Sequence, residues 1–267
     1  MSTKDTLGYR NLPLHKIPEY WASFKPTENI TATKEEEWKT KVEFLDNLSV
    51  YKNVVIYLIN TYTNRFVYIN DKTNILAGLS PELFMAENGL EFSISRLHPD
   101  HVEASLKLTQ IGLNFYADSS LSDYKNIALN QNYLYKNGQD EYVQLLQQGM
   151  ILEVDDSGRP ALSIWLVHKV GHIKKADSAA LVITSPSVVQ LYSYNRQQNI
   201  IEPPKTFSDQ EKKIISLLAQ GDDTKTIAEK LFISAHTVDT HRRNLIKKAE
   251  CRDTTGVVDF ARLINLI

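Results

Sequence analysis

The sequence lacks the features of a secreted or membrane-spanning protein. Cys251 is the single cysteine among 267 residues, which excludes an internal disulfide and fits a reducing compartment. The polar start MSTKDTLGYRN has no apolar core of a signal peptide, and no apolar run reaches the length that spans a bilayer. We therefore expect a cytoplasmic protein without a membrane anchor.

Motifs of enzymes are also missing. The chain has no glycine-rich phosphate-binding loop and no nucleophile motif, so we predict that it is not an enzyme. His98, Asp100 and His101 suggest a metal cluster, but Asp100 fits better as a helix cap beside a solvated loop. His168 and His172 suggest haem ligands, but histidines at a strand edge are the simpler interpretation. We predict no metal site and leave any cofactor unknown.

Charge is spread unevenly along the chain. The whole sequence has 30 basic and 32 acidic residues, but the 64 residues from 204 to 267 hold 11 basic and 9 acidic ones. The upstream part is left with 19 basic and 23 acidic residues. Attraction to DNA is therefore expected at the C-terminal end and not upstream.

The C-terminal 64 residues have the helix signals of a helix-turn-helix. Ser208 with Glu211 is a capping box that opens a first helix, and Gly221 ends it. Asp222 or Asp223 then caps a short second helix. The small residue Ala228 lies on the face of the second helix that meets the first, so the two can approach closely.

A third helix begins after Ser234 and carries the chemistry of a DNA groove. Its core-facing positions recur at helical spacing and are Val238, His241, Leu245 and Ala249. Arg243 on the opposite face can contact a guanine with two hydrogen bonds, and Thr240 can contact a base edge. We expect Arg242, Lys247 and Lys248 to neutralise phosphates.

This segment resembles the C-terminal domain of LuxR-type (FixJ/NarL-type) bacterial regulators without a gap from Phe207 to Val258. The matched positions are Glu211, Gly221, Lys225, Ile227, Ala228, Leu231, Ile233, Ser234, Thr237, Val238, His241, Arg242, Asn244 and Lys248. The resemblance implies a four-helix domain with positions 239, 240 and 243 at base edges and structural roles for His241 and Asn244. We assign DNA binding to Lys225, His236, Thr237, Asp239, Thr240, Arg242, Arg243 and Lys247.

Three positions depart from the LuxR-type pattern. Ala235 stands in place of a frequent proline, and Glu250 in place of the usual glycine after the third helix. Asp239 puts a negative charge near phosphates, so it must accept from a cytosine amine or pair with Arg243 four residues on. We favour the pairing, because it would hold the guanidinium in place for guanine.

Upstream, the pattern is α+β. Thr33 and Glu36 form a capping box for a leader helix over about 33–50, with Trp38 and Val42 on its apolar face. Strands are predicted at 54–59 and 65–70, then short helices, then strands at 131–137, 141–154 and 161–170 around the turn signals Asn137-Gly138 and Asp156-Ser157-Gly158.

This order of elements resembles a PAS domain over about Leu48 to Lys174. The resemblance implies a five-stranded antiparallel sheet and a role in sensing a small molecule or in dimerisation. The candidate ligand pocket is formed by Tyr57, Tyr68, Phe92 and Trp165, although such aromatics are more often plain core. A flavin-thiol photosensor is excluded, because Cys251 lies outside the PAS-like segment.

Four regions follow from these patterns: an N-terminal extension (1–47), a PAS-like domain (48–175), an ordered β-hairpin connector (176–203) and the helix-turn-helix domain (204–267). The connector is poor in glycine and serine, so we expect strands around ALVITS and VVQLYSYN, with a boundary at Pro203-Pro204.

The function we predict is a sequence-specific transcription regulator that binds operator DNA as a homodimer and receives an unknown small-molecule signal. The alternative is a PAS-mediated scaffold with weak or lost DNA binding. The last helix has more apolar surface than one small domain covers, so we expect part of it against a partner and expect Val258→Asp to spare the fold. The leader helix around Trp38 and Val42 is a second candidate for the dimer contact.

Overall fold

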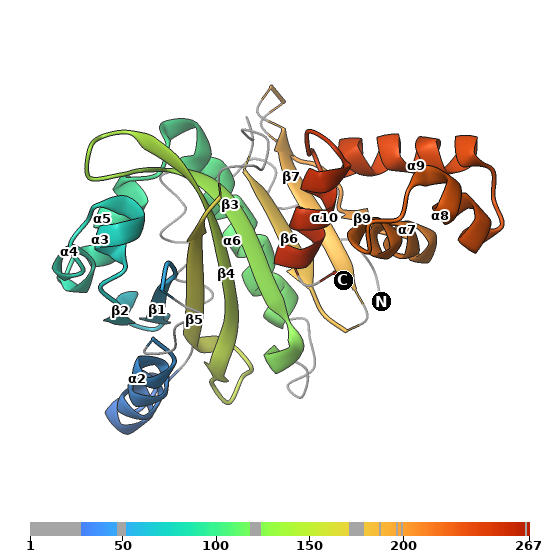
Figure 1. The fold of residues 1–267 in the computed structure, drawn as a ribbon. Coiled ribbons are helices and arrows are strands. Elements are labelled where there is room, and N and C mark those ends of the chain that lie inside the picture. Colours follow the sequence, from blue (N-terminus) through green and yellow to red (C-terminus); the bar gives the residue numbers. More distant parts are fainter. Residues whose placement is uncertain are drawn as a thin grey trace.

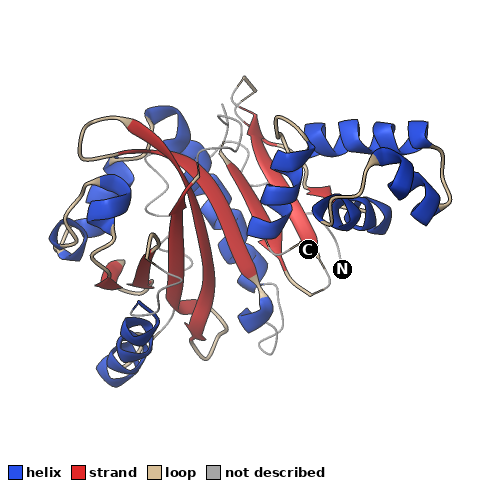
Figure 2. Ribbon diagram, in the orientation of Figure 1, coloured by secondary structure: helices blue, strands red, loops and turns tan. Residues whose placement is uncertain are grey.

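The computed structural model describes residues 28–46, 52–117, 124–170, 179–186, 188–195, 197–198, 200–264 and 266–267. A curved antiparallel sheet with helices on both faces comes first, and four helices follow it (Figure 1, Figure 2). We call the part from α2 to β8 the sheet domain and the part from α7 to α10 the helical domain. None of the described helices is both long enough and apolar enough to cross a membrane.

Five strands of the sheet domain form the PAS-like part. They are β1 (Val55–Asn60), β2 (Arg65–Ile69), β3 (Ala128–Lys136), β4 (Tyr142–Val154) and β5 (Pro160–Lys169). They lie side by side in the order β2-β1-β5-β4-β3, and neighbouring strands are antiparallel. Two strands, short helices and three further strands in one antiparallel sheet are the PAS-like arrangement that the resemblance predicted.

The sheet continues beyond β3 through the segment predicted as a connector. β6 (Ala180–Thr184) pairs with β3 and with β7 (Val189–Asn195), and the short strands β8 (Ile200–Ile201) and β9 (Lys205–Thr206) pair with β7. The predicted strands are therefore present, but they extend the sheet and do not stand free between two domains. Hydrogen bonds to β3 satisfy the backbone groups that an isolated hairpin would leave to water.

Helices cover both faces of the sheet. The short helices α3 (Thr73–Ala77), α4 (Glu82–Met85) and α5 (Gly89–Ser95) and the long α6 (Pro99–Ala117) pack on one face, which we call the inner face. A 3₁₀ turn, η4 (Tyr124–Asn126), precedes β3. The helix α2 (Ala32–Asp46) packs on the opposite, outer face at the β1 end.

Two details of the leader helix differ from the prediction. The helix begins at Ala32, and Thr31, not Thr33, caps it by accepting a hydrogen bond from the Lys34 backbone N–H at 3.3 Å. Trp38 and Val42 pack against the chain's own sheet, where the Trp38 indole donates to Glu153 at 2.7 Å. Because these side chains already have a partner within the chain, they do not form a free dimer surface.

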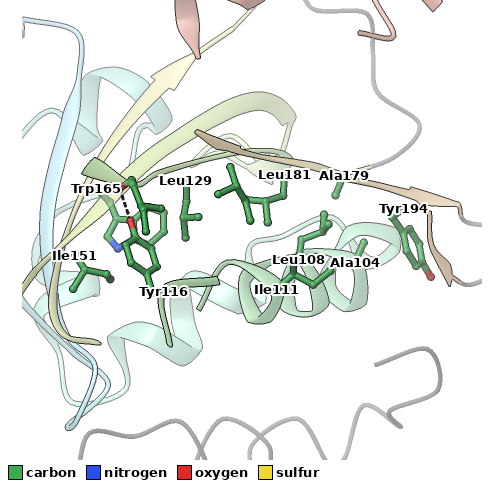
Figure 3. Packing of buried hydrophobic residues seen from close by; sticks show 12 residues of the cluster. Ala104, Leu108, Ile111, Tyr116, Leu129, Ile151, Trp165, Ala179, Leu181 and Tyr194 are labelled. Carbon is green, nitrogen blue, oxygen red and sulfur yellow. Dashed lines mark hydrogen bonds between the residues drawn. The ribbon is translucent and has the colours of Figure 1, made fainter. Parts of the chain in front are cut away.

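A large apolar cluster fills the space between α6 and the inner face. Leu108 and Ile111 of α6 lie beneath Leu129 of β3 and Leu181 of β6, and the cluster runs from Trp165 to Tyr194 (Figure 3). Its other members are Ala104, Tyr116, Ile127, Ile151, Ala179 and Ile183. The extension of the sheet therefore shares one core with the PAS-like strands.

The helical domain has the caps that the sequence predicted. Its helices are α7 (Asp209–Ala219), α8 (Thr224–Leu231), α9 (Ala235–Lys248) and α10 (Thr254–Leu263). Ser208 and Glu211 form a complete capping box, Asp223 caps α8, and Ser234 caps α9. Gly221 follows α7 with a φ of +88°, a backbone angle that favours glycine.

The helix α10 packs on the outer face of the extended sheet. Ile264, just beyond its last turn, is fully buried with Val182 of β6 and Leu191 of β7. Figure 1 shows α10 lying across β6 and β7, with α7, α8 and α9 on its far side. The sequence predicted that part of the apolar surface of the last helix lies against a partner. In the structure, the sheet of the same chain covers this surface.

Candidate functional site

The helix α9 presents its polar face to solvent. Val238 and Leu245 on its other side are fully buried against α7, α8 and α10. Of the residues assigned to DNA binding, the exposed ones are Lys225, His236, Asp239, Arg243 and Lys247, and the partly buried ones are Thr237, Thr240 and Arg242. The fold therefore brings most of these side chains to one accessible surface, with Lys225 contributed by α8.

Arg243 is held by its own helix. Its Nη2 donates to the Thr240 hydroxyl at 3.2 Å, and its Nε donates to the backbone carbonyl of Asp239 at 3.4 Å. The Asp239 carboxylate instead accepts a hydrogen bond from Thr224 of α8 at 3.0 Å. The expected ion pair between Asp239 and Arg243 is therefore wrong, because the first turn of α8 offers the carboxylate a nearer donor.

Arg242 makes contacts between helices, and its phosphate contact stays a prediction. Its guanidinium donates to the hydroxyls of Thr224 at 2.5 Å and Thr254 at 3.3 Å. These contacts join α9 to the N-terminal turns of α8 and α10. Thr224, which the sequence analysis did not single out, thus holds both Asp239 and Arg242.

Lys248 also forms contacts within the chain. Its ammonium lies 2.5 and 2.7 Å from the two carboxylate oxygens of Glu211 and donates to the Thr206 carbonyl at 3.1 Å. Burial alone would raise the pKa of Glu211, but Lys248 and the capping contacts with Ser208 bring it below its ordinary value. Lys248 thus forms a partly buried ion pair that joins the end of α9 to the start of α7, and its phosphate contact stays a prediction.

Other cations assigned to DNA binding are exposed on the same surface. Arg243 and Lys247 are exposed and form no ion pair within the part of the chain that the structure describes. Cations without an acidic partner keep their full attraction for phosphate and for the acceptor edge of guanine.

A cavity of about 180 Å³ lies on the inner face of the sheet, under α5 and α6. Of the four aromatic residues proposed from the sequence, Tyr57 and Trp165 line it. Tyr68 does not, because it is paired with Leu58 in the strand register and both point to the outer face, toward α2. Phe92 also lies outside the lining and packs edge-on against Phe84.

The polar groups that line the cavity are almost all uncharged. The Tyr133 hydroxyl donates to the Gln147 side chain at 2.8 Å. Burial raises the pKa of Tyr57, of Tyr133 and, to about 12, of Tyr135, so these hydroxyls stay neutral. Among the described residues, Arg159 is the one charged side chain in the lining. The pattern of alternate residues along β3 could have indicated the tyrosines, since Tyr133 and Tyr135 share one face of the strand.

The Ser105 hydroxyl is a buried group that faces this cavity. Its residue is 5% exposed, and its oxygen has no hydrogen-bond partner among the described residues. A buried hydroxyl without a partner is costly, and a bound molecule or ordered water would satisfy it.

The histidines considered as ligands have other contacts. The Nδ1 atoms of His98 and His101 accept from the backbone N–H groups of Asp100 and Leu134, both at 3.2 Å. His98 thus accepts a hydrogen bond at the start of α6, and His101 is buried in place of lying in a solvated loop. Burial lowers the pKa of His168, while His172 lies outside the described residues.

Residues 205–261 match the family described as "Bacterial regulatory proteins, luxR family". The C-terminal segment is a LuxR-family domain. A putative transcriptional regulator of Pseudomonas aeruginosa is 35% identical over 79 residues, which are 29% of this chain and 38% of that protein. The oxygen regulatory protein NreC of Staphylococcus aureus is 33% identical over 81 residues, 30% of this chain and 37% of NreC.

The matches to these curated relatives thus cover well under half of the relatives' length and less than a third of this chain. The family consists of regulatory proteins, which agrees with the prediction that the chain is not an enzyme. The resemblance given by the sequence is confirmed for this domain.

Two solved structures share features of the chain at low identity. The N-terminal domain of a diguanylate cyclase with a PAS/PAC sensor, from Marinobacter aquaeolei, is 19% identical and covers 43% of this chain and 94% of that one, with a TM-score of 0.35. VqmA of Vibrio cholerae is 13% identical and covers 85% of this chain and 88% of that one, with a TM-score of 0.31. Because both TM-scores are low, the PAS-like assignment depends on the strand arrangement described above.

Proposed function

We propose that the chain is a sequence-specific transcription regulator that binds duplex DNA through the exposed face of α9. The observation that carries this proposal is the position of Arg243. It lies on the solvent face of a capped helix inside a LuxR-family domain, without an acidic partner among the described residues, and Thr240 holds its guanidinium. A preorganised guanidinium in that position suits a bidentate contact with guanine.

Selection from a random duplex library, followed by mobility-shift titration of the full chain, tests this function. Arg243→Ala should weaken binding to the selected site by about 1–3 kcal/mol and relax the base preference there. Lys247→Ala should weaken binding to all sequences and lower the salt slope by about one unit. Lys213→Ala, an exposed lysine of α7, is the matched control and should change neither. Equal losses on selected and random DNA for Arg243→Ala would remove the base-reading role.

Asp239 offers a second test of the same surface. Its carboxylate is held by Thr224, so Asp239→Asn should keep the geometry while it removes the charge. A changed preferred sequence would support base readout, whereas tighter binding to every sequence would show that the charge only repels phosphates.

We also propose that the regulator acts as a homodimer, because one helix-turn-helix spans too few base pairs for useful affinity. The selected site should then contain two half-sites about one helical turn apart, and sedimentation should show two chains per duplex. A wild-type chain that binds no duplex at any salt concentration, yet dimerises, would favour the scaffold function instead.

The 180 Å³ cavity supports a further part of the proposal, the binding of a small uncharged signal molecule. Neutral tyrosine, glutamine and serine groups surround it, so a charged ligand would lose its hydration without an ionic partner in most of the lining. Native mass spectrometry of the protein purified from its own host should show a bound small molecule. The Ser105→Met variant, whose longer side chain fills the cavity, should not carry this molecule. Identical spectra for both proteins, with no added mass, would contradict this part.

A further inference from the structure

The strands β3 and β4 have different contacts on their two faces. Gln131 and Tyr133 of β3 and Gln147 of β4 line the cavity on the inner face. Asn130 of β3 and Gln148 of β4, which are directly paired in the register, point to the outer face. Because side chains alternate along a strand, the two sets are separated only by the backbone.

The outer set holds α10. The Gln148 side-chain amide donates to Asn130 Oδ1 at 2.7 Å and also to the backbone carbonyl of Leu263, in the last turn of α10. Carbonyls in the last turn of a helix have no partner within the helix, so this amide acts as a C-terminal cap supplied by the sheet domain. The Gln148 side chain of β4 thus binds the end of α10, the last helix of the helical domain.

Apolar contacts and a small pocket complete this seam, which we define as the contact of β3, β4, β6 and β7 with α10. Val182, Leu191 and Ile264 are each at most 3% exposed. Beside them lies a pocket of about 40 Å³ into which Ser193 points, and the Ser193 hydroxyl has no partner among the described residues. Such a pocket has room for about two or three waters. A partly polar seam with room for water resembles a contact between domains that can separate.

We propose that the seam is the device by which the sheet domain controls the LuxR-family domain: occupation of the cavity displaces β3 and β4, and the Asn130–Gln148 pair passes the displacement to α10. In the structure, the Gln148 amide and Ile264 hold the LuxR-family domain in one orientation. The inference depends on the proposed function for the ligand, but the docking of α10 and its release are measurable without DNA and without the natural signal.

Spin labels on the full chain measure the docking. Asp156→Cys in the β4–β5 turn and Lys213→Cys in α7 are exposed sites on the two sides of the seam. Cys251 stays unlabelled, because burial, assisted by nearby acidic side chains, raises the pKa of its thiol to about 12. Double electron–electron resonance then reports the fraction of molecules at the docked distance.

Gln148→Leu removes the donor and keeps the volume of the side chain. The undocked fraction should rise about fivefold, the change expected for one lost hydrogen bond of about 1 kcal/mol. Gln144→Leu, four residues earlier on the same face of β4 and outside the seam pocket, is the matched control and should leave the distances unchanged. Ile264→Ala, which removes apolar contact from the same seam, should raise the undocked fraction by at least about tenfold. Unchanged distances in both seam variants would overturn the proposal.

A double-mutant cycle tests whether the cavity and the seam are coupled. Ser105→Met occupies the cavity and stands in for the ligand, so it should change the docked fraction in the wild-type background and have little further effect when Gln148→Leu is present. Equal effects of Ser105→Met in the two backgrounds, or no effect in either, would overturn the coupling. Failure here leaves the DNA-binding proposal standing, because the effects of Arg243→Ala are measured separately on duplex DNA.

Discussion

Replacement of Lys248 by methionine separates two roles for this lysine, a phosphate contact and a partner for a buried carboxylate. In the structure, the Lys248 ammonium lies 2.5 Å from Glu211, whose residue is 7% exposed, while about a quarter of the Lys248 side chain is accessible. Removal of one member of a fully buried pair costs about 3–5 kcal/mol, because the other charge is stranded. Since Lys248 is partly exposed, we expect a loss of about 2–3 kcal/mol in the stability of the helical domain.

Native-state hydrogen exchange at the amides of α7 and α9 measures this loss within the full chain. Lys213→Met on the exposed face of α7 is the control and should change the opening free energy by less than about 0.5 kcal/mol. The double variant Glu211→Gln with Lys248→Met should recover most of the loss, because glutamine keeps the capping box and no charge is stranded. If Lys248→Met leaves exchange unchanged and lowers the salt slope of DNA binding by about one unit, the lysine is a phosphate contact and the structural role is refuted.

Three further predictions follow from buried groups. Val258 is 7% exposed, so Val258→Asp should unfold the helical domain, contrary to the expectation from sequence, and circular dichroism should show the loss of helix. Folding lowers the pKa of Glu211, so the stabilisation by its carboxylate is complete above the ordinary pKa of 4.5 and is lost as the pH falls through the lowered pKa. In Glu211→Gln, the stability measured by hydrogen exchange should therefore fall less steeply at acid pH. Gly149→Ala would place Cβ 2.2 Å from the Trp165 ring. The free energy of unfolding in urea should therefore fall by about 1–3 kcal/mol, and the tryptophan emission should shift. An unchanged spectrum would contradict the close packing of this ring against β4.

The caps of the helical domain were predictable because each depends on residues close in sequence. Ser208, Asp223 and Ser234 each accept a hydrogen bond from a backbone N–H three residues later, so the signal is complete within four residues. The PAS-like strands were predictable for a similar reason, since runs of alternating residues and turn signals such as Asn137-Gly138 fix strands locally.

The partners of individual side chains were less predictable. Asp239 and Arg243 are four residues apart on one helix, which favours a pair, yet Thr224 from another helix takes the carboxylate. Tyr68 looked like a pocket residue by composition, but a shift in register between β1 and β2 and the alternation of side chains place it on the outer face. In both cases the outcome depended on which element lies opposite, and spacing within one segment does not contain that information.

By itself, the sequence determined the kinds of elements, the order of the two domains and the LuxR-family character of the last 64 residues, because these follow from local hydrogen bonding and from the period of apolar residues. The tertiary structure alone decided how the domains meet. The β6–β7 segment extends the sheet, its inner face joins the core under α6, and its outer face buries Ile264 beyond α10. Burial of apolar surface is not directional, so an apolar strand or helix face specifies that it will be covered, but only the three-dimensional arrangement of the whole chain specifies by what.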